Sequence, residues 1–551
     1  MRHFCFLFLF LFSLACFSQD TIKIKLYPGD TLKTIPSDFA GLSFEKNCLN
    51  KGFFGPADYT LIQLFTTCGI KSMRVGANAV DTDHLGTVAD SSHFTTGELD
   101  DLFLFARSAG CKILLGLNLR DYNPSLAATE ASYVMQHHSC ELFGFEVGNE
   151  PDLYAKHHYR GPTYWDSNYV REYMHYYDTI KHNNSSAVFT GPGCASKYNE
   201  FTEPFRRTMG SKISMLTQHY YGGDTTAVTV HERIDTLLSK KKLRLVSKEV
   251  DSLVKCADSS GIPFRMSECN SWDDGGKKGV SNAFASALWA LDYMYKLADD
   301  GCAGVNFHGG LNGWYTVFSK YGNIYRARPI AYGILAFQIG SKGKFISSTV
   351  TNNNINLDSY SVVDDTSKNI YTTIINKETD TLQNAVINLD VDAGISNYLS
   401  AEYVRLSSPS VGDTTTVTLG GQVVDSKGII PAYNWLPLTV SSHKTQIPVP
   451  AGSAVVLKFK YVYGNSINDN FENNKHFLNL FPNPASDKVT ISTDMTEHSV
   501  ISVYNLQGQL LLQQQMQQGK ADIDISELAK GVYIVRSYSN ARVEAGRIIK
   551  E

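Results

Sequence analysis

The sequence has little excess charge of either sign, and beyond its first residues it has no long apolar run. Its 50 Lys and Arg residues nearly balance 54 Asp and Glu residues, for a formal net charge of -4. This balance lacks the basic signature of nucleic-acid binding, so no such partner is expected. Because no later segment is long and apolar enough to cross a bilayer, the mature chain is expected to have no transmembrane segment.

Several patterns typical of other enzyme classes are also missing. No Gly-rich dinucleotide-binding turn, zinc-binding His pattern or serine nucleophile elbow occurs in the sequence. Eight of the ten cysteines lie between residues 48 and 302, at uneven spacings that match no metal site. Disulfides are allowed, but their pairing cannot be read from the sequence. Neither a cofactor nor a metal is therefore expected.

The N-terminus carries an export signal. Arg2 precedes an apolar run over residues 4–12, and small and polar residues follow up to Ser18. This pattern predicts a signal peptide over residues 1–18. Cys16 leaves a lipoprotein as an alternative, although Ser13 stands where a lipidation signal usually has an aliphatic residue.

A chain of 551 residues with 43% hydrophobic residues is expected to form two or three domains. Residues 38–341 alternate short β-rich runs with amphipathic helical stretches, which is typical of a parallel sheet. Eight strands are expected, the number that closes a TIM-type (β/α)8 barrel. An open doubly wound sheet is the alternative. The expected strands cover residues 40–44, 72–76, 112–117, 143–148, 187–190, 214–220, 263–267 and 304–308.

The rest of the chain predicts further β-rich parts, so the expected fold class is α/β. Residues 342–463 alternate apolar and polar residues and predict a β-sandwich, which residues 19–37 are expected to join. Residues 464–476 are rich in Asn, Asp, Ser and Gly and predict a linker. Residues 477–551 predict a small all-β module.

Two expected barrel strands end in a glutamate. The run FGFEVGNEP over residues 143–151 has Asn149 and Glu150 before its final proline, and the run PFRMSECNS over residues 263–271 contains Glu268. Carboxyl ends of barrel strands face the active site, so both side chains are expected there. Asn149 can bind a sugar hydroxyl.

The two glutamates are 118 residues apart, or three β/α units, which places them across one barrel mouth. A retaining glycosidase needs two carboxyl groups about 5 to 5.5 Å apart, one as nucleophile and one as general acid/base. We therefore predict Glu268 as nucleophile and Glu150 as acid/base. A single glutamate at the end of a strand is more often a surface residue or an ion-pair partner. Glutamates at two strand ends of one barrel together favour a catalytic role.

Longer motifs resemble glycoside hydrolase family 79, the β-glucuronidase and heparanase-like group of retaining barrel glycosidases. The motifs are SMRVGANAVD (72–81), GFEVGNEPDLY (144–154), TQHYYGG (217–223), the stretch from FRMSECNSW (264–272) onward, and GVNFHGG (304–310). The resemblance extends over barrel and sandwich. It implies hydrolysis of terminal β-D-glucuronides from glycans or glycosides by double displacement.

The resemblance also implies roles for residues around the two glutamates. Tyr220 would lie beside the nucleophile, Glu45 and Asn78 would bind sugar hydroxyls, and His308 and Tyr315 would line the pocket. Each has a structural alternative: a barrel-lining aromatic for Tyr220, a fold-stabilising polar pair for Glu45 and Asn78, and a packed core histidine for His308.

The loop after the expected nucleophile departs from the family. Glucuronidases of the group commonly have a tyrosine that, with glycine amides, holds the uronate carboxylate, whereas this chain has Trp272 followed by Asp273. An aspartate there would repel a carboxylate. Gly275 and Gly276 still offer amides for an anion, and Asp273 could instead bind the 6-hydroxyl of a neutral sugar. A neutral β-glucoside-like substrate is therefore an alternative, as is a non-catalytic carbohydrate-binding surface protein.

The C-terminal module resembles the sorting domain of the type IX secretion system. It contains FPNP (481–484), VYNLQGQ (503–509) and KGVYIVR (530–536). The resemblance implies the secretion machinery as a partner, and a location outside the cell or attached to its outer surface. An ordinary carbohydrate-binding appendage is the alternative.

Overall fold

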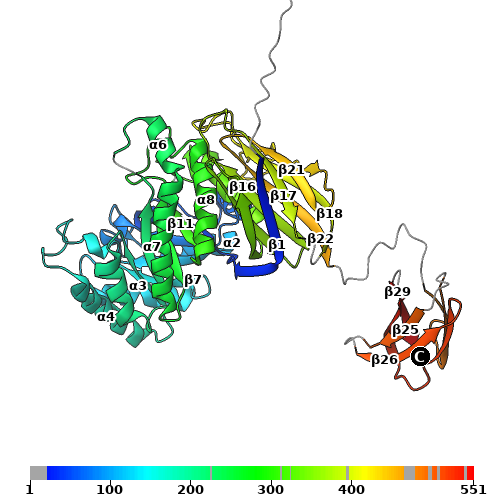
Figure 1. Ribbon diagram of the computed structural model, residues 1–551. Helices are drawn as coiled ribbons and strands as arrows, with labels where there is room; N and C mark the ends of the chain where they lie inside the picture. The colour runs from blue at the N-terminus through cyan, green and yellow to red at the C-terminus, as the bar shows by residue number, and fades with distance from the viewer. Residues whose placement is uncertain are drawn as a thin grey trace, which may run out of the picture. The chain divides into compact units, whose positions relative to one another are not determined.

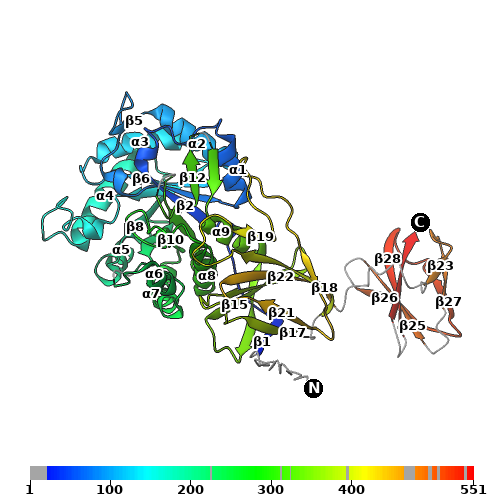
Figure 2. The same ribbon diagram turned by 90° about the horizontal axis from the view of Figure 1, so that it is seen from above.

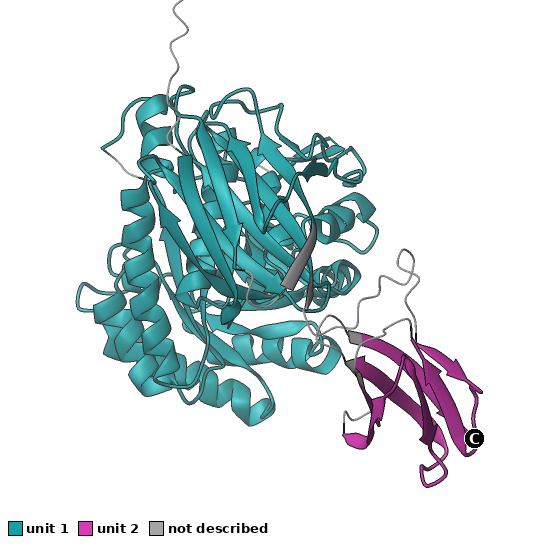
Figure 3. Ribbon diagram, turned by 45° about the vertical axis from the view of Figure 1, so that its right-hand side comes forward, with its two compact units in different colours: residues 1–462 teal, residues 463–551 magenta. Residues whose placement is uncertain are grey.

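The computed structural model describes residues 21–223, 226–310, 313–322, 324–392, 396–463, 478–493, 499–505, 509–538 and 543–551. They divide into two compact units, residues 1–462 and residues 463–551 (Figure 3). The expected signal peptide over residues 1–18 and the expected linker over residues 464–476 lie outside the described residues.

Eight parallel strands of the first unit close into a barrel, which confirms the predicted TIM-type fold (Figures 1 and 2). Around the closed sheet their order is β10-β11-β2-β3-β6-β7-β8-β9. The strands are β2 (Ala40–Glu45), β3 (Ser72–Gly76), β6 (Lys112–Leu117), β7 (Leu142–Val147), β8 (Phe189–Cys194), β9 (Met215–Tyr221), β10 (Phe264–Asn270) and β11 (Val305–His308). Each strand bonds to both neighbours, so the barrel has no free edge.

Helices form between the barrel strands where apolar residues recur at helical spacing and polar residues cap the ends. In α2, the Thr95 side chain accepts from the Gly97 amide, Glu98 caps back onto Thr95, and Gly110 ends the helix in the left-handed conformation at φ 66°. The α-helices are α1 (Tyr59–Thr67), α2 (Thr96–Ala109), α3 (Pro124–His137), α4 (Asp166–Asn183), α5 (Glu203–Met209), α6 (Val230–Leu237), α7 (Lys240–Asp258), α8 (Phe284–Asp300) and α9 (Pro329–Gly340).

Short elements lie in the connections that follow several of the barrel strands. They are the 3-10 helices η1 (Lys46–Cys48), η2 (Asn78–Asp81) and η3 (Pro151–Leu153), the π-helix η4 (Tyr198–Thr202), and the strands β4 (His84–Leu85), β5 (His93–Phe94), β12 (Phe318–Tyr321) and β13 (Ile324–Ala327).

Two barrel strands run further than the sequence predicts. Strand β8 was expected over residues 187–190, but it spans Phe189–Cys194 and includes the Gly191-Pro192-Gly193 run, whose residue types are common in turns. Strand β10 was expected to stop before Glu268 and instead continues to Asn270. In both, pairing with the neighbouring strands overrides the local turn or strand-end signal.

A ten-stranded sheet accompanies the barrel in the first unit, in the order β19-β18-β22-β16-β15-β14-β1-β17-β21, with β20 paired to β18. Strand β1 (Thr21–Thr34) pairs antiparallel with β14 and parallel with β17, so the first described strand belongs to this sheet (Figure 1). The other strands are β14 (Lys344–Thr351), β15 (Leu357–Asp364), β16 (Asn369–Asn376), β17 (Ala385–Val391), β18 (Ser396–Ser407), β19 (Thr418–Leu419), β20 (Leu436–Leu438), β21 (Lys444–Val449) and β22 (Ser453–Tyr463).

A buried ion-pair cluster joins this sheet to the barrel. The ammonium of Lys377 contacts Asp292 of α8 and lies 2.7 Å from Asp358 of β15, and Tyr360 donates to Asp292 at 2.8 Å. Breaking a buried pair of this kind by removing one partner is strongly destabilising. The cluster therefore fixes α8, and with it the barrel, against the sheet.

The second unit has its own small core, formed by residues such as Val489, Ile501, Val535 and Ile548. Its strands lie in a three-stranded and a four-stranded sheet. They are β23 (Asn479–Phe481), β24 (Lys488–Ser492), β25 (Ser499–Tyr504), β26 (Leu510–Met516), β27 (Lys520–Asp524), β28 (Gly531–Tyr538) and β29 (Val543–Lys550).

Among the described helices, none combines the length and apolarity needed to cross a bilayer. The eight cysteines between residues 48 and 302 are free thiols, all buried except Cys140. They pack as small apolar side chains.

Candidate active site

Asn149 and Glu150 follow strand β7 on a sharp turn of the backbone. Gly148 has φ 80° and Glu150 has φ 49°, so both adopt the left-handed conformation. A glutamate there costs on the order of 1–3 kcal/mol and must be held by its surroundings. The Glu150 amide donates to the Gly193 carbonyl at 3.0 Å, and Pro151 then starts η3. The turn aims the Glu150 side chain at the barrel mouth.

Glu268 lies within strand β10 and not at its end. The pairing of β10 with β9 shifts register between Met266 and Glu268, because Met266 pairs with Gln218 while Glu268 pairs with His219. Such a bulge re-aims the side chains that follow it, which is common next to active sites. Here it directs Glu268 into the barrel mouth.

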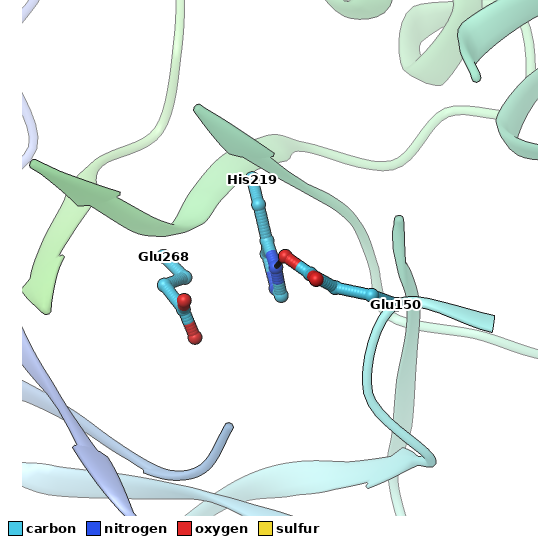
Figure 4. A group of neighbouring side chains, drawn as sticks. All are labelled: Glu150, His219 and Glu268. Atoms are coloured by element: carbon cyan, nitrogen blue, oxygen red, sulfur yellow. Dashed lines mark hydrogen bonds and ion pairs between the residues drawn. The ribbon is translucent and has the colours of Figure 1, made fainter. Parts of the chain in front are cut away.

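The two glutamates meet in the barrel mouth, together with His219 of β9 (Figure 4). One carboxylate oxygen of Glu150, one of Glu268 and one ring nitrogen of His219 all lie within 4.8 Å of one another. Two carboxylates and an imidazole are also a set that could hold a metal ion. However, Arg74 already places a guanidinium nitrogen 2.7 Å from Glu268, and this positive charge would oppose a bound cation.

Arg74 of β3 is the centre of a buried cluster that includes Glu268. Its Nε donates to Glu146 at 2.7 Å, one terminal nitrogen donates to Glu268 at 2.7 Å, and the other donates to Asn149 at 2.9 Å. Its side chain is fully buried. We call Arg74, Glu146, Asn149, Tyr221 and Glu268 the site floor.

The hydroxyl beside Glu268 belongs to Tyr221, which corrects the prediction of Tyr220. Tyr221 donates to Glu268 at 2.6 Å, whereas Tyr220 stacks on Tyr293 of α8 at 5.8 Å. Successive side chains of a strand point to opposite faces. His219 and Tyr221 of β9 therefore share the inner face, and Tyr220 points out toward the helices.

The pKa of Glu268 is low despite its burial. Burial by itself raises this pKa, but the charges of His308, His219 and Arg74 and the hydrogen bond from Tyr221 outweigh it and lower the pKa to about 2. Glu268 is therefore an anion at neutral pH.

Glu150 has fewer charged neighbours and more contact with solvent. Its carboxylate is 2.9 Å from Nδ1 of His219, and its side chain is 18% exposed, against 6% for Glu268. A carboxyl group in this setting can exchange protons with water as well as with a bound ligand.

Glu45, Asn78, His308 and Tyr315 all lie close to the floor. Asn78 accepts from the Asn149 amide group at 3.1 Å, and Glu45 accepts from the Ala79 amide at 2.7 Å. The rings of His308 and Tyr315 lie 5.8 Å apart.

The imidazole of His308 lies between two carboxylates, 3.7 Å from Glu268 and 3.7 Å from Glu45. Burial lowers the pKa of His308, but these two carboxylates outweigh it and raise the pKa above its usual value. The neighbouring carboxylates therefore favour the protonated form of His308.

The loop over residues 272–278 is less tied to the site. Asp273 is exposed, and the Gly276 amide donates to the Asp273 carbonyl at 2.9 Å. That amide is thus already used within the turn, contrary to the predicted anion contact. The Gly275 carbonyl accepts from the Trp314 amide at 2.7 Å. Trp272 is buried against Gly223, so it packs the loop.

Sequence reasoning overlooked Arg74, Glu146, His219 and Tyr221. For Arg74 and Glu146 the sequence offers one signal. Each is a charged residue inside a mostly apolar strand, and a buried charge needs a partner. His219 and Tyr221 alternate with the outward Tyr220, but the sequence does not say which set faces inward.

Two curated relatives match part of the chain. A protein named beta-glucuronidase from Aspergillus niger is 27% identical over 199 residues, covering 33% of this chain and 37% of the relative. Another of the same name from Neurospora crassa is 27% identical over 222 residues, covering 36% and 39%. The chain therefore spans less than two fifths of these relatives.

A solved structure agrees over most of the first unit. The 4-O-alpha-L-rhamnosyl-beta-D-glucuronidase from Fusarium oxysporum superposes with a TM-score of 0.65 over 79% of this chain and 99% of the other, at 17% identity. At that identity the likeness establishes the fold. The two curated relatives confirm the predicted resemblance to the β-glucuronidase group over about a third of the chain.

Residues 479–551 match the family described as secretion system C-terminal sorting domain. The match confirms the predicted sorting module. The chain is accordingly secreted or attached to the cell surface.

Proposed function

We propose that this chain is a retaining β-glycosidase that hydrolyses terminal β-D-glucuronides. The observation that carries the proposal is the approach of Glu150 and Glu268 to within 4.8 Å at the mouth of a closed barrel. Retaining enzymes need about 5 to 5.5 Å between their carboxyl groups, and inverting enzymes need about 6.5 to 9.5 Å. The names of the two curated relatives and of the Fusarium structure support glucuronate as the sugar.

In the proposed reaction Glu268 is the nucleophile and Glu150 the acid/base. A Glu268 oxygen bonds to the anomeric carbon while the bond to the leaving oxygen breaks and Glu150 gives that oxygen a proton. Glu150 then takes a proton from water as the water attacks the glycosyl ester, which frees Glu268. The low pKa of Glu268 supports its role, because a nucleophile must be ionised.

Other residues would bind and orient the sugar. Asn149 and Asn78 are hydrogen-bonded to one another and have amide groups suited to sugar hydroxyls. Glu45, His308 and Tyr315 complete this side of the mouth. The proposal also includes the secretion machinery as the partner of residues 479–551 and a carbohydrate as the substrate.

A neutral β-glycoside is the second candidate substrate. The exposed carboxylate of Asp273 and the engaged amide of Gly276 favour it, since both leave the loop poorly suited to an anionic sugar. A carbohydrate-binding protein without turnover is the third candidate.

A panel of aryl β-glycosides separates the three candidates. The glucuronide should give the highest kcat/KM, compared with the glucoside, galactoside and xyloside. A clear preference for a neutral sugar would replace glucuronate with that sugar. Binding of a glycoside without turnover of any member of the panel would reject the assignment of this chain as an enzyme.

A further inference from the structure

Glu146 has no place in the proposed reaction, although it is the most enclosed carboxylate of the site. It lies on β7, four residues before Glu150, and its side chain has no exposed surface. Leaving an acidic side chain in such a position is costly unless its charge is paired and hydrogen-bonded. The groups around Glu146 should therefore include partners that stabilise its buried charge.

Three donors surround the Glu146 carboxylate. Arg74 Nε donates to one oxygen at 2.7 Å, and Thr217 of β9 donates to the other at 2.7 Å, with Ser267 of β10 at 3.5 Å. Gly193 leaves room on the remaining side, because a Cβ there would lie 3.0 Å from the carboxylate. Strands β3, β7, β8, β9 and β10 thus all contribute to this one site.

Arg74 connects Glu146 to Glu268. One guanidinium stands between two carboxylates, with its Nε on Glu146 and a terminal nitrogen on Glu268, both at 2.7 Å. The planar guanidinium group fixes the relative position of these contacts. The positive charge that Glu268 experiences is thus partly balanced by the negative charge of Glu146.

We infer that Glu146 is a positioning residue that acts through Arg74 and keeps Glu268 basic enough to attack. This inference rests on the proposed function. Without the charge of Glu146, Arg74 would stabilise the Glu268 anion more strongly. Glu268 would then be a weaker nucleophile in the first step and a better leaving group in the second.

Loss of the Glu146 charge should therefore slow the first step and favour the second. A residue with a purely structural role would not affect the two steps in opposite directions. For Glu146→Gln, kcat/KM on an aryl glycoside with a poor leaving group should fall about tenfold. The kcat on a dinitrophenyl glycoside, limited by hydrolysis of the glycosyl ester, should stay within about twofold of wild type or rise. The ratio of the first constant to the second should thus fall at least about fivefold.

Two further variants complete the experiment. Glu146→Asp keeps the charge but moves it away from Arg74, so its ratio should lie between those of wild type and Glu146→Gln. If Glu146→Gln does not fold, the Asp variant carries the test and should lower the ratio at least about twofold. Asp292→Asn is the matched control, because it removes another buried, paired carboxylate without touching Arg74.

An equal fall in both constants, or an unchanged ratio in the Gln and Asp variants, would overturn the inference. A change in ratio for Asp292→Asn as large as for Glu146→Gln would overturn it as well. Failure of the proposed function is distinguishable, because then the wild type itself would turn over no aryl β-glycoside.

Discussion

The site floor and the loop over residues 272–278 face the same barrel mouth but differ in construction. The charged groups of the floor are buried and paired: Arg74, Glu146 and Glu268 are joined by contacts of 2.7 Å. In the loop, Asp273 is exposed, and one of the two glycine amides is used within the turn. The difference indicates that the floor sets the chemistry and that the loop has only a small influence on which sugar is accepted.

The largest expected effect is the loss of the proposed nucleophile from the floor. Glu268→Ala should lower kcat on an aryl β-glucuronide on the order of 10⁴-fold or more, because no other group can form the glycosyl ester. Activity is measured on protein whose melting curve shows a folded state. Glu200→Ala changes an exposed glutamate within η4 that contacts none of the floor residues; it is the control and should keep wild-type turnover. Near-normal turnover of Glu268→Ala would remove Glu268 from the mechanism.

Two neighbouring tyrosines offer a matched pair for the next effect. Tyr221→Phe removes the hydrogen bond to Glu268 and should lower kcat about tenfold or more. Tyr220→Phe removes a hydroxyl on the helix side of the strand and should stay within about twofold of wild type. Equal losses of kcat in the two variants would contradict the placement of Tyr221 on the inner face of β9 and of Tyr220 on its outer face.

The charges of the site floor should also affect the stability of the fold. Because the pKa of Glu268 is lowered from 4.5 to about 2, its ionised form stabilises the fold above pH 4.5, and this contribution is lost as the pH falls toward 2. The free energy of unfolding of wild type minus that of Glu268→Gln should therefore decrease between pH 4.5 and 2, by on the order of 3 kcal/mol. Chemical unfolding at several pH values measures it. A difference that does not change with pH would contradict the low pKa.

The smallest effect is expected in the loop. Asp273→Asn should change the ratio of kcat/KM for aryl glucuronide over glucoside by less than about threefold, because solvent and salt screen an exposed charge. The same panel at low and at physiological salt checks this. A change of more than about tenfold would place the loop among the main determinants of the substrate.

Much of the barrel could be predicted from sequence because its strands are short apolar runs bounded by turn residues. Both glutamates could be found because each follows such a run. The extent of β8 could not, since Gly191-Pro192-Gly193 favours a turn locally and only its neighbours hold it in the sheet. The position of Tyr221 beside Glu268 could not be predicted either, because it depends on strand register, and the bulge between Met266 and Glu268 leaves no local sequence signal.

The partners within the floor depend on three-dimensional structure in the same way. Arg74 and Glu146 are 72 residues apart in the sequence. Neither strand contains a pattern that identifies the other residue as its partner. A buried charge in an apolar strand indicates that a partner exists. Only closure of the barrel identifies it.

The stereochemistry of the first product tests the central claim most directly. Proton NMR of a β-glycoside during the first turnovers shows which anomer forms before mutarotation. Two carboxylates within 4.8 Å predict that the β-anomer appears first. First appearance of the α-anomer would contradict the account, because inversion requires the two groups to stand further apart.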